Sequence, residues 1–187
     1  MSAKGRPERE GSPTSATAPA AGFDIKPARR EDLDAILSMI RALAEYEKLA
    51  HLCVGTSADL DAALFGPRPA AEVLLAWKAG KPAAFALFFH NFSTFLGRRG
   101  LWLEDLFVRP EFRRQGCAHA LLRTLAGIAR SRDCGRFEWA VLDWNRSAID
   151  FYQTLGAAIL PDWRICRVTG DALVSLAEGA TLAPRSA

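Results

Sequence analysis

The sequence predicts one domain of mixed helices and strands, of the α/β or α+β class. Three apolar runs of strand length follow one another in the middle of the chain, and strand-like and helix-like runs alternate after them. The chain has 187 residues, half of them hydrophobic, which is enough for a single core. We expect the domain to span 23–177, between a disordered leader rich in Ala, Pro and Ser at 1–22 and a flexible tail at 178–187.

The first half of the domain is expected to hold two helices and most of the strands. Its expected elements are a strand at 23–28, helices at 30–49 and 56–66, two strands within 71–92 about a turn at 79–82, and a strand at 101–108. Alternation of apolar and polar residues predicts the first strand, and apolar residues at helical spacing predict the first helix. The second helix has Thr56 or Ser57 as its cap and Gly66 as its stop.

The second half alternates helices and strands. Its expected elements are a helix at 118–135, a strand at 136–144, a helix at 145–157, a strand at 163–169 and a frayed helix at 170–177. Gly135 and Gly156 end the first two of these helices, and Asn145 caps the second.

Composition excludes several classes of protein. No two of the four cysteines have C-x-x-C spacing, and no histidine pairs with them at a zinc-finger spacing, so we expect reduced thiols and no metal site. A net charge of +3, with arginines gathered at one loop, does not indicate nucleic-acid binding. No apolar run reaches the roughly 20 residues of a membrane span, and the first residues lack the apolar core of a signal peptide. We therefore expect a cytoplasmic protein that binds neither nucleic acid nor membrane.

The loop "RPEFRRQGCA", at 109–118, joins a strand to a helix and has the features of an anion site. A helix start has unpaired backbone N–H groups and a positive dipole end. Gly116 and the small Ala118 allow an anion to approach, and Arg113 and Arg114 add positive charge. The loop lacks both G-x-x-x-x-G-K-[ST] and G-x-G-x-x-G, which disfavours a P-loop or a Rossmann site. A pyrophosphate site and a solvated basic turn both remain open.

Three further residues are candidates for chemistry. Glu104 and Asp105 interrupt an apolar strand, where carboxylates are costly unless they are paired or used. Adjacent strand residues face opposite sides, so only one of the two is expected in a given pocket, and a solvent-facing or loop-capping role is the alternative. Asn145 opens a helix after a strand and is expected near the carboxyl end of the sheet, where ligands collect in α/β folds. Tyr152 lies about two turns further along this helix, and a core aromatic is its alternative role.

The order "LEDLFVRPEFRRQGCAHALL" and then "VLDWNRSAIDFYQTLGA" resembles the GCN5-related N-acetyltransferase (GNAT) superfamily. Arg113, Gly116 and Ala118 match its loop motif, Arg/Gln-x-x-Gly-x-Gly/Ala. Together with "LAEYE", the pattern is most similar to the diamine (spermidine/spermine) and thialysine N-acetyltransferases, from about Phe23 to Ala177. The resemblance implies a single GNAT-type domain whose mixed, mostly antiparallel sheet is flanked by helices and splayed at an acetyl-CoA site.

The resemblance also implies an acetyl-CoA-dependent enzyme and the roles of individual residues. Glu104 would be the base and Tyr152 the acid of a direct transfer without an acetyl-enzyme. Cys117, a rival nucleophile, occupies a variable motif position, so we interpret it as structural. The implied cofactor-binding residues are Leu106, Phe107, Val108, Arg113, Arg114, Gln115, Gly116, Cys117, Ala118, His119, Asn145, Arg146, Ser147 and Ala148. The implied amine-binding residues are Tyr46, Glu47, Glu104, Asp105, Glu138, Trp139 and Ala140.

The substrate implied is the primary amine of a small molecule: a diamine, a polyamine, or an amino acid like thialysine or lysine. Lys48, Arg98 and Arg99 place positive charge where the polyamine enzymes carry more acid, so we expect a small amine with its own carboxylate to be preferred. A homodimer with the last strand near its interface is also implied. A protein or peptide N-acetyltransferase and a non-enzymatic acyl-CoA-binding module remain as alternatives.

Overall fold

The computed structural model describes residues 22–179. The expected leader up to residue 21 and the expected tail from residue 180 lie outside the described residues. The chain divides into two compact units, one up to Ala140 and one from Val141.

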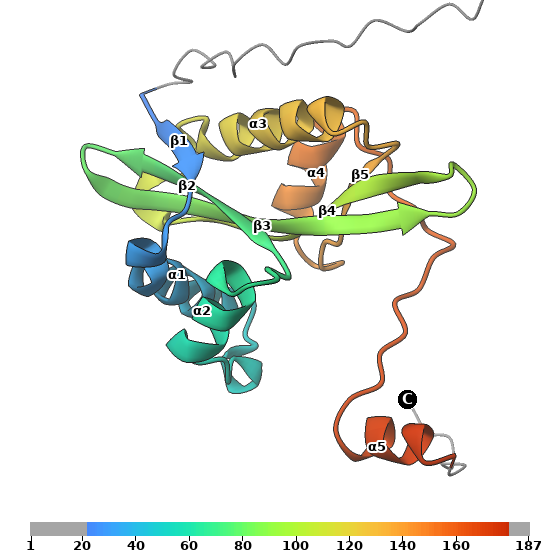
Figure 1. Cartoon of the computed structure of the whole chain (residues 1–187). Coiled ribbons are helices and arrows are strands. Elements are labelled where there is room, and N and C mark those ends of the chain that lie inside the picture. Colours follow the sequence, from blue (N-terminus) through green and yellow to red (C-terminus); the bar gives the residue numbers. More distant parts are fainter. Residues whose placement is uncertain (1–21, 180–187) are drawn as a thin grey trace, which may run out of the picture. The chain divides into compact units, whose positions relative to one another are not determined.

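The first unit is built on a five-stranded sheet. Its strands are β1 (Asp24–Pro27), β2 (Glu72–Lys78), β3 (Lys81–Ser93), β4 (Arg98–Val108) and β5 (Phe137–Trp139). They lie in sequence order across the sheet (Figure 1), each antiparallel to the next except β5, which runs parallel to β4. The mixed, mostly antiparallel sheet that we expected is therefore confirmed.

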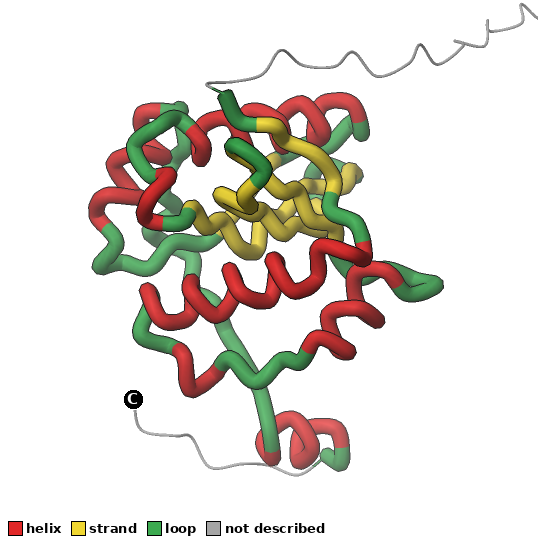
Figure 2. The backbone as a smooth tube through the Cα atoms, turned by 90° about the vertical axis from the view of Figure 1, so that its left-hand side faces the viewer, coloured by secondary structure: helices red, strands yellow, loops and turns green. Residues whose placement is uncertain are grey.

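Helices cover both faces of this sheet. They are α1 (Leu33–Tyr46), α2 (Ser57–Phe65) and α3 (Cys117–Ser131), with 3₁₀ turns at Arg30–Asp32, Ala50–Leu52 and Pro110–Phe112. α3 lies on one face and α1 with α2 on the other (Figure 1), and Figure 2 shows the yellow strands between red helices. Ile36 and Met39 of α1 pack with Leu75 and Phe85 of the sheet in the core. None of the helices within 22–179 is long and apolar enough to cross a bilayer.

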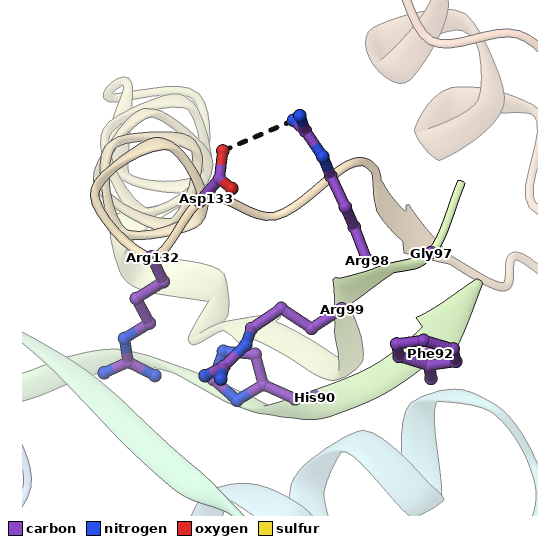
Figure 3. A pocket seen from close by; sticks show the side chains of 7 residues that line it. All are labelled: His90, Phe92, Gly97, Arg98, Arg99, Arg132 and Asp133. Atoms are coloured by element: carbon purple, nitrogen blue, oxygen red, sulfur yellow. Dashed lines mark hydrogen bonds and ion pairs between the residues drawn. The ribbon is translucent and has the colours of Figure 1, made fainter. Parts of the chain in front are cut away.

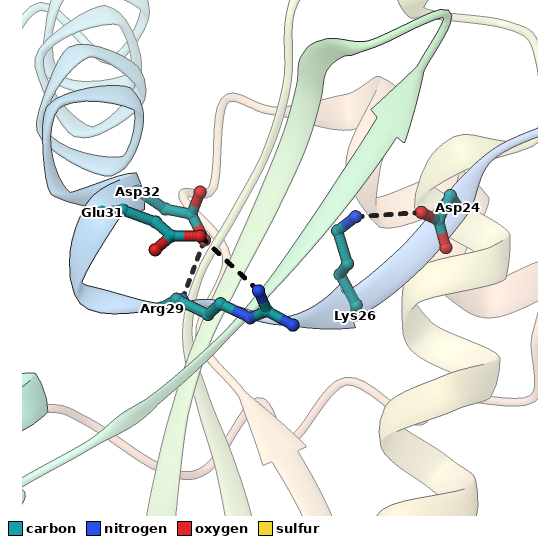
Figure 4. Close-up of polar contacts among 5 residues, drawn as sticks. All are labelled: Asp24, Lys26, Arg29, Glu31 and Asp32. Atoms are coloured by element: carbon teal, nitrogen blue, oxygen red, sulfur yellow. Dashed lines mark hydrogen bonds and ion pairs between the residues drawn. The ribbon is translucent and has the colours of Figure 1, made fainter.

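The connection from β1 to α1 is fixed by local polar contacts (Figure 4). The backbone N–H of Arg29 donates to Asp32 Oδ2 over 2.8 Å, which closes the turn before α1. Ion pairs join Lys26 to Asp24 at 3.1 Å and Arg29 to Glu31 at 3.6 Å. These side chains are exposed, so each ion pair adds only about 0–1 kcal/mol to stability.

The sheet is open between β4 and β5. Their pairing covers only Leu101–Leu103 of β4 and Phe137–Trp139 of β5. β4 continues to Val108, so its residues 104–108 have no strand partner on this edge among the described residues. The expected strand at 136–144 is thus much shorter than predicted, and the splayed sheet that we expected is confirmed.

A β-bulge interrupts the register of β3 and β4 at the carboxylate pair. Phe88 lies opposite Leu103, whereas Leu87 lies opposite Asp105, so Glu104 is the extra residue without a partner on β3. A bulge breaks the strict alternation of side chains along a strand and bends it locally. The expectation that the two carboxylates point to opposite faces does not apply to a bulged strand.

The second unit holds two short helices, α4 (Arg146–Thr154) and α5 (Asp171–Ala177). Both were expected, with Asn145 as the cap of α4. The expected strand at 163–169 is wrong, because this segment forms neither helix nor strand. A strand needs a neighbour to satisfy its backbone groups, and no strand within 141–179 pairs with this segment.

Candidate active site

The N-terminus of α3 presents unpaired backbone donors. Gly116 precedes the helix with φ of 81°, a left-handed conformation that suits glycine, and Arg114 also has a positive φ of 60°. The first backbone bond into the helix runs from the Ala120 N–H to the Gly116 carbonyl over 3.0 Å. The N–H groups of residues 117–119 have no bond to another backbone group or a cap within 22–179. Such a terminus favours an anion through these donors and the helix dipole.

Lys78, at the end of β2, adds a cation beside this loop. Its Nζ donates to Gln115 Oε1 over 2.6 Å, and Gln115 Nε2 donates to the Glu111 carbonyl over 2.9 Å. The ammonium also lies 4.8 Å from the ring centroid of Phe23. Sequence reasoning missed Lys78, although the predicted turn at 79–82 could have placed it at this end of the sheet.

Arg113 connects β4 to the end of α1. Its Nε donates to the Val108 carbonyl over 3.0 Å, and its guanidinium lies 4.9 Å from the ring of Tyr46 and 5.6 Å from that of Phe107. Arg113 and Tyr46, expected at the cofactor and amine sites respectively, are therefore neighbours. The contacts to Val108 and the two rings orient the loop, whereas a role of Arg113 toward phosphate stays a prediction.

Asp105, beside the bulge, is affected by two other carboxylates. Glu104 is exposed and accepts a 2.8 Å hydrogen bond from Trp102 Nε1. Burial, followed by the charges of Glu104 and Glu47, raises the pKa of Asp105 to about 6. Burial also raises the pKa of Glu47, which follows the last residue of α1. The structure thus places Asp105 within reach of the charges of two other residues expected to bind the amine, and a bound cation would offset their repulsion.

The expected amine-binding residues on β5 have partners already. Glu138 lies 2.8 Å from Arg136 Nε and accepts a 3.2 Å hydrogen bond from Asn91 Nδ2. The ring of Trp139 packs 4.9 Å from that of Phe137, and Ala140 follows the strand end. The charge of Glu138 is therefore balanced by Arg136, and its role toward an amine stays a prediction.

Cys117 is unsuited to nucleophilic catalysis. Its side chain is only 2% exposed, and burial raises its pKa to about 11 against the smaller opposing effect of Lys78. The thiolate is the reactive form, so a thiol with this pKa is inert at neutral pH. This supports our interpretation of Cys117 as structural.

The remaining expected residues lie in the second unit. Asn145 Oδ1 accepts hydrogen bonds from the Ala148 N–H over 3.3 Å and from Ser147 Oγ over 3.2 Å, which confirms the predicted cap. Arg146, Ser147 and Ala148 form the first turn of α4. Tyr152 lies further along, its ring 5.6 Å from that of Phe151. Their roles toward cofactor and catalysis stay predictions.

No group of three or more His, Cys, Asp or Glu side chains within the described part of the chain could bind a metal ion. The chemistry available is that of carboxylates, backbone donors, cations and a tyrosine. Leu106, Phe107 and Val108 add the unpaired edge of β4, where an extended ligand could pair with backbone groups.

The unpaired edge of β4 and the donor-rich start of α3 fit the acyl-coenzyme A site that the resemblance implies. The model of the acetyltransferase (GNAT) family matches residues 37–157. The chain belongs to this family, and it is an N-acetyltransferase. Enzymes of this family generally use acetyl-CoA.

Known relatives agree with this assignment. The chain is 39% identical to thialysine N-epsilon-acetyltransferase of Sus scrofa, over 82% of this chain and 96% of the relative. It is 32% identical to L-ornithine N5-acetyltransferase of Arabidopsis thaliana, over 81% and 86% respectively. An integron cassette protein from the mobile metagenome of V. cholerae has the same fold, with a TM-score of 0.72 and 24% identity over 84% of this chain and 98% of that one.

Proposed function

We propose that this enzyme transfers the acetyl group of acetyl-CoA to the side-chain amine of a small amino acid like thialysine, lysine or ornithine. The observation that carries the proposal is the buried carboxyl of Asp105, which is affected by the charges of Glu104 and Glu47, so that an ammonium group would be bound favourably there. Lys48, directly after Glu47, could pair with the carboxylate of such a substrate. Two relatives act, by their names, on thialysine and ornithine.

The expected repulsion of polyamines by Arg98 and Arg99 finds little support in the structure. Arg99 is five residues before Glu104 on β4, or about 17 Å along the strand. This exceeds the roughly 8 Å over which charges act in physiological salt. Arg98 is moreover paired with Asp133. The preference for an amino acid over a diamine or polyamine therefore depends on Lys48 and on the relatives.

Acetyl-CoA fits the donors at the start of α3. The N–H groups of residues 117–119 and the side chains of Lys78 and Arg114 would hold its phosphates. The unpaired edge of β4 at residues 106–108 would pair with its pantetheine arm. When bound, acetyl-CoA supplies an acetyl group activated as a thioester.

Residues of the chain then carry out two proton transfers, one from the ammonium and one to the leaving sulfur. An alkylammonium has a pKa near 10.4 and must lose a proton before its nitrogen can attack. Glu47 and Asp105 bind the ammonium, and Glu104, fixed by Trp102, accepts the proton directly or through water. Tyr152 donates the proton that the leaving sulfur takes up. The new C–N bond forms as the C–S bond breaks, with no covalent enzyme intermediate.

Coenzyme A release over a panel of amines tests this proposal. We expect kcat/KM for thialysine and ornithine to exceed that for spermidine, spermine and a lysine peptide by about tenfold or more, the effect of one good polar contact. Comparable values for spermine or the peptide would contradict the substrate class. Initial rates varied in both substrates should give intersecting lines, whereas parallel lines would indicate an acetyl-enzyme.

We further propose a cytoplasmic homodimer. The segment 163–169 supports the dimer, because it is rich in apolar residues and forms no strand within its own unit. Light scattering on the purified chain tests it, and a monomer mass at micromolar concentration would refute it.

A further inference from the structure

A cavity lies at the opposite end of α3 from the loop proposed to bind acetyl-CoA (Figure 3). Its volume is about 540 Å³, within the range of small-molecule sites. The side chains that line it belong to His90, Phe92, Arg98, Arg99, Arg132 and Asp133. They come from β3, from the start of β4 and from the residues just after α3. Since α3 has 15 residues, this cavity lies about 22 Å from the start of the helix.

The acidic groups at this cavity are already engaged. Asp133 accepts a 3.3 Å hydrogen bond from Arg98. Glu72 accepts from both terminal nitrogens of Arg132, in one case over 2.7 Å. Arg99 makes no side-chain hydrogen bond or ion pair within residues 22–179, so the cavity retains one uncompensated positive charge. Figure 3 shows Arg99 and Arg132 extending toward His90.

His90 adds a polar group without a partner. Its Nε2 is buried and has no hydrogen bond to any described residue. Burial, followed by the charges of Arg132 and Arg99, lowers the pKa of His90 and so favours the neutral form of its ring. An unpaired buried polar atom costs free energy that a suitable ligand can recover.

Three of the last four carbonyl groups of α3 are already engaged. The carbonyl groups of Ile128, Ala129 and Arg130 accept from the N–H groups of residues 132, 134 and 133 respectively. The negative end of the helix dipole is therefore partly satisfied by the chain itself. The guanidinium of Arg99 is a donor that remains for a ligand.

We infer that this cavity binds a small oxyanion, a carboxylate or a phosphate, through the guanidinium of Arg99 with Arg132 and His90 beside it. A planar guanidinium suits such anions because it can donate two parallel hydrogen bonds. The exposed Arg99 side chain can turn to admit the ligand to His90. Phe92 provides an apolar wall for an organic anion. The site is separate from the acyl-transfer site and does not depend on the proposed function.

The ring signals of His90 provide the test. Potassium phosphate and potassium acetate are titrated separately into the full chain at pH 7, at constant ionic strength set with KCl, and followed by NMR. His90→Gln assigns the signal among the three histidines. We expect a saturable shift and a raised His90 pKa, since a bound anion offsets the charges of Arg99 and Arg132. Arg99→Gln should weaken binding about tenfold or more, the effect of losing one charged hydrogen bond.

The control is Arg130→Gln, which removes the same charge from an exposed position on α3 that does not line the cavity. It should bind like the wild type, and thermal melting verifies that both variants fold. Saturation by phosphate or by acetate supports the site and identifies the anion preferred. Shifts no larger than those in KCl alone, or equal shifts in Arg99→Gln, would overturn it. None of these readouts requires acetyl transfer, so the proposed function can fail independently.

Discussion

Replacing Asp105 with Asn should stabilise the protein at neutral pH. Burial and the charges of Glu104 and Glu47 raise the pKa of this carboxyl from 3.8 to about 6. At about 1.4 kcal/mol per pKa unit, a shift of roughly two units corresponds to about 3 kcal/mol. Because the folded-state pKa is raised, this contribution is present below about pH 4 and is lost as the pH rises through 6. Asn carries no charge, so the Asp105→Asn variant does not lose this stability as the pH rises.

Urea denaturation followed by tryptophan fluorescence, at pH steps from 4 to 8, measures this effect. The free energy of unfolding of Asp105→Asn should exceed that of the wild type by up to about 3 kcal/mol at pH 7. The advantage should shrink below pH 6 and vanish near pH 4. Glu111→Gln, an exposed carboxyl near the same end of the sheet, is the control and should show no such pH-dependent gain. A gain independent of pH, or a less stable variant at pH 7, would refute the reasoning.

Three further substitutions test the site by steady-state kinetics. Tyr152→Phe should lower kcat about 100-fold or more with little change in the KM for acetyl-CoA, as for loss of a general acid, and unchanged turnover would exclude that role. Lys78→Met should raise the KM for acetyl-CoA about fivefold by removing a cation beside the loop, whereas the exposed Lys81→Met should not; equal effects would argue against a local contact. The kcat of Cys117→Ala should stay within about twofold of the wild-type value, whereas a large loss of kcat would indicate that the cysteine is the nucleophile.

Local signals predicted the helices well. Thr56 accepts from the Asp59 N–H and Gly66 ends α2, as the capping pattern indicated. Asn145 likewise caps α4. A cap and the turn it closes lie within a few residues of one another, so the sequence contains the whole interaction. The loop at 113–119 was found for the same reason.

Interactions between distant residues were not predictable in this way. The bulge at Glu104 depends on the register of β4 against Leu87 and Phe88 of β3. The contact of Lys78 with Gln115 joins residues 37 positions apart. The segment 163–169 has the composition of a strand but no partner strand in its unit. In each case a pairing partner decides the outcome, and composition does not specify partners.

The sequence alone determined the class of fold, the family and the position of the glycine-containing loop before α3, because each depends on short motifs and on periodicity. Only the tertiary structure decided how the chemistry is arranged. It brought the charges of Glu47 and Glu104 to bear on Asp105, buried the thiol of Cys117, and placed Arg99 at a separate cavity. Charge and reactivity depend on burial and on neighbours in space, which are properties of the packed chain.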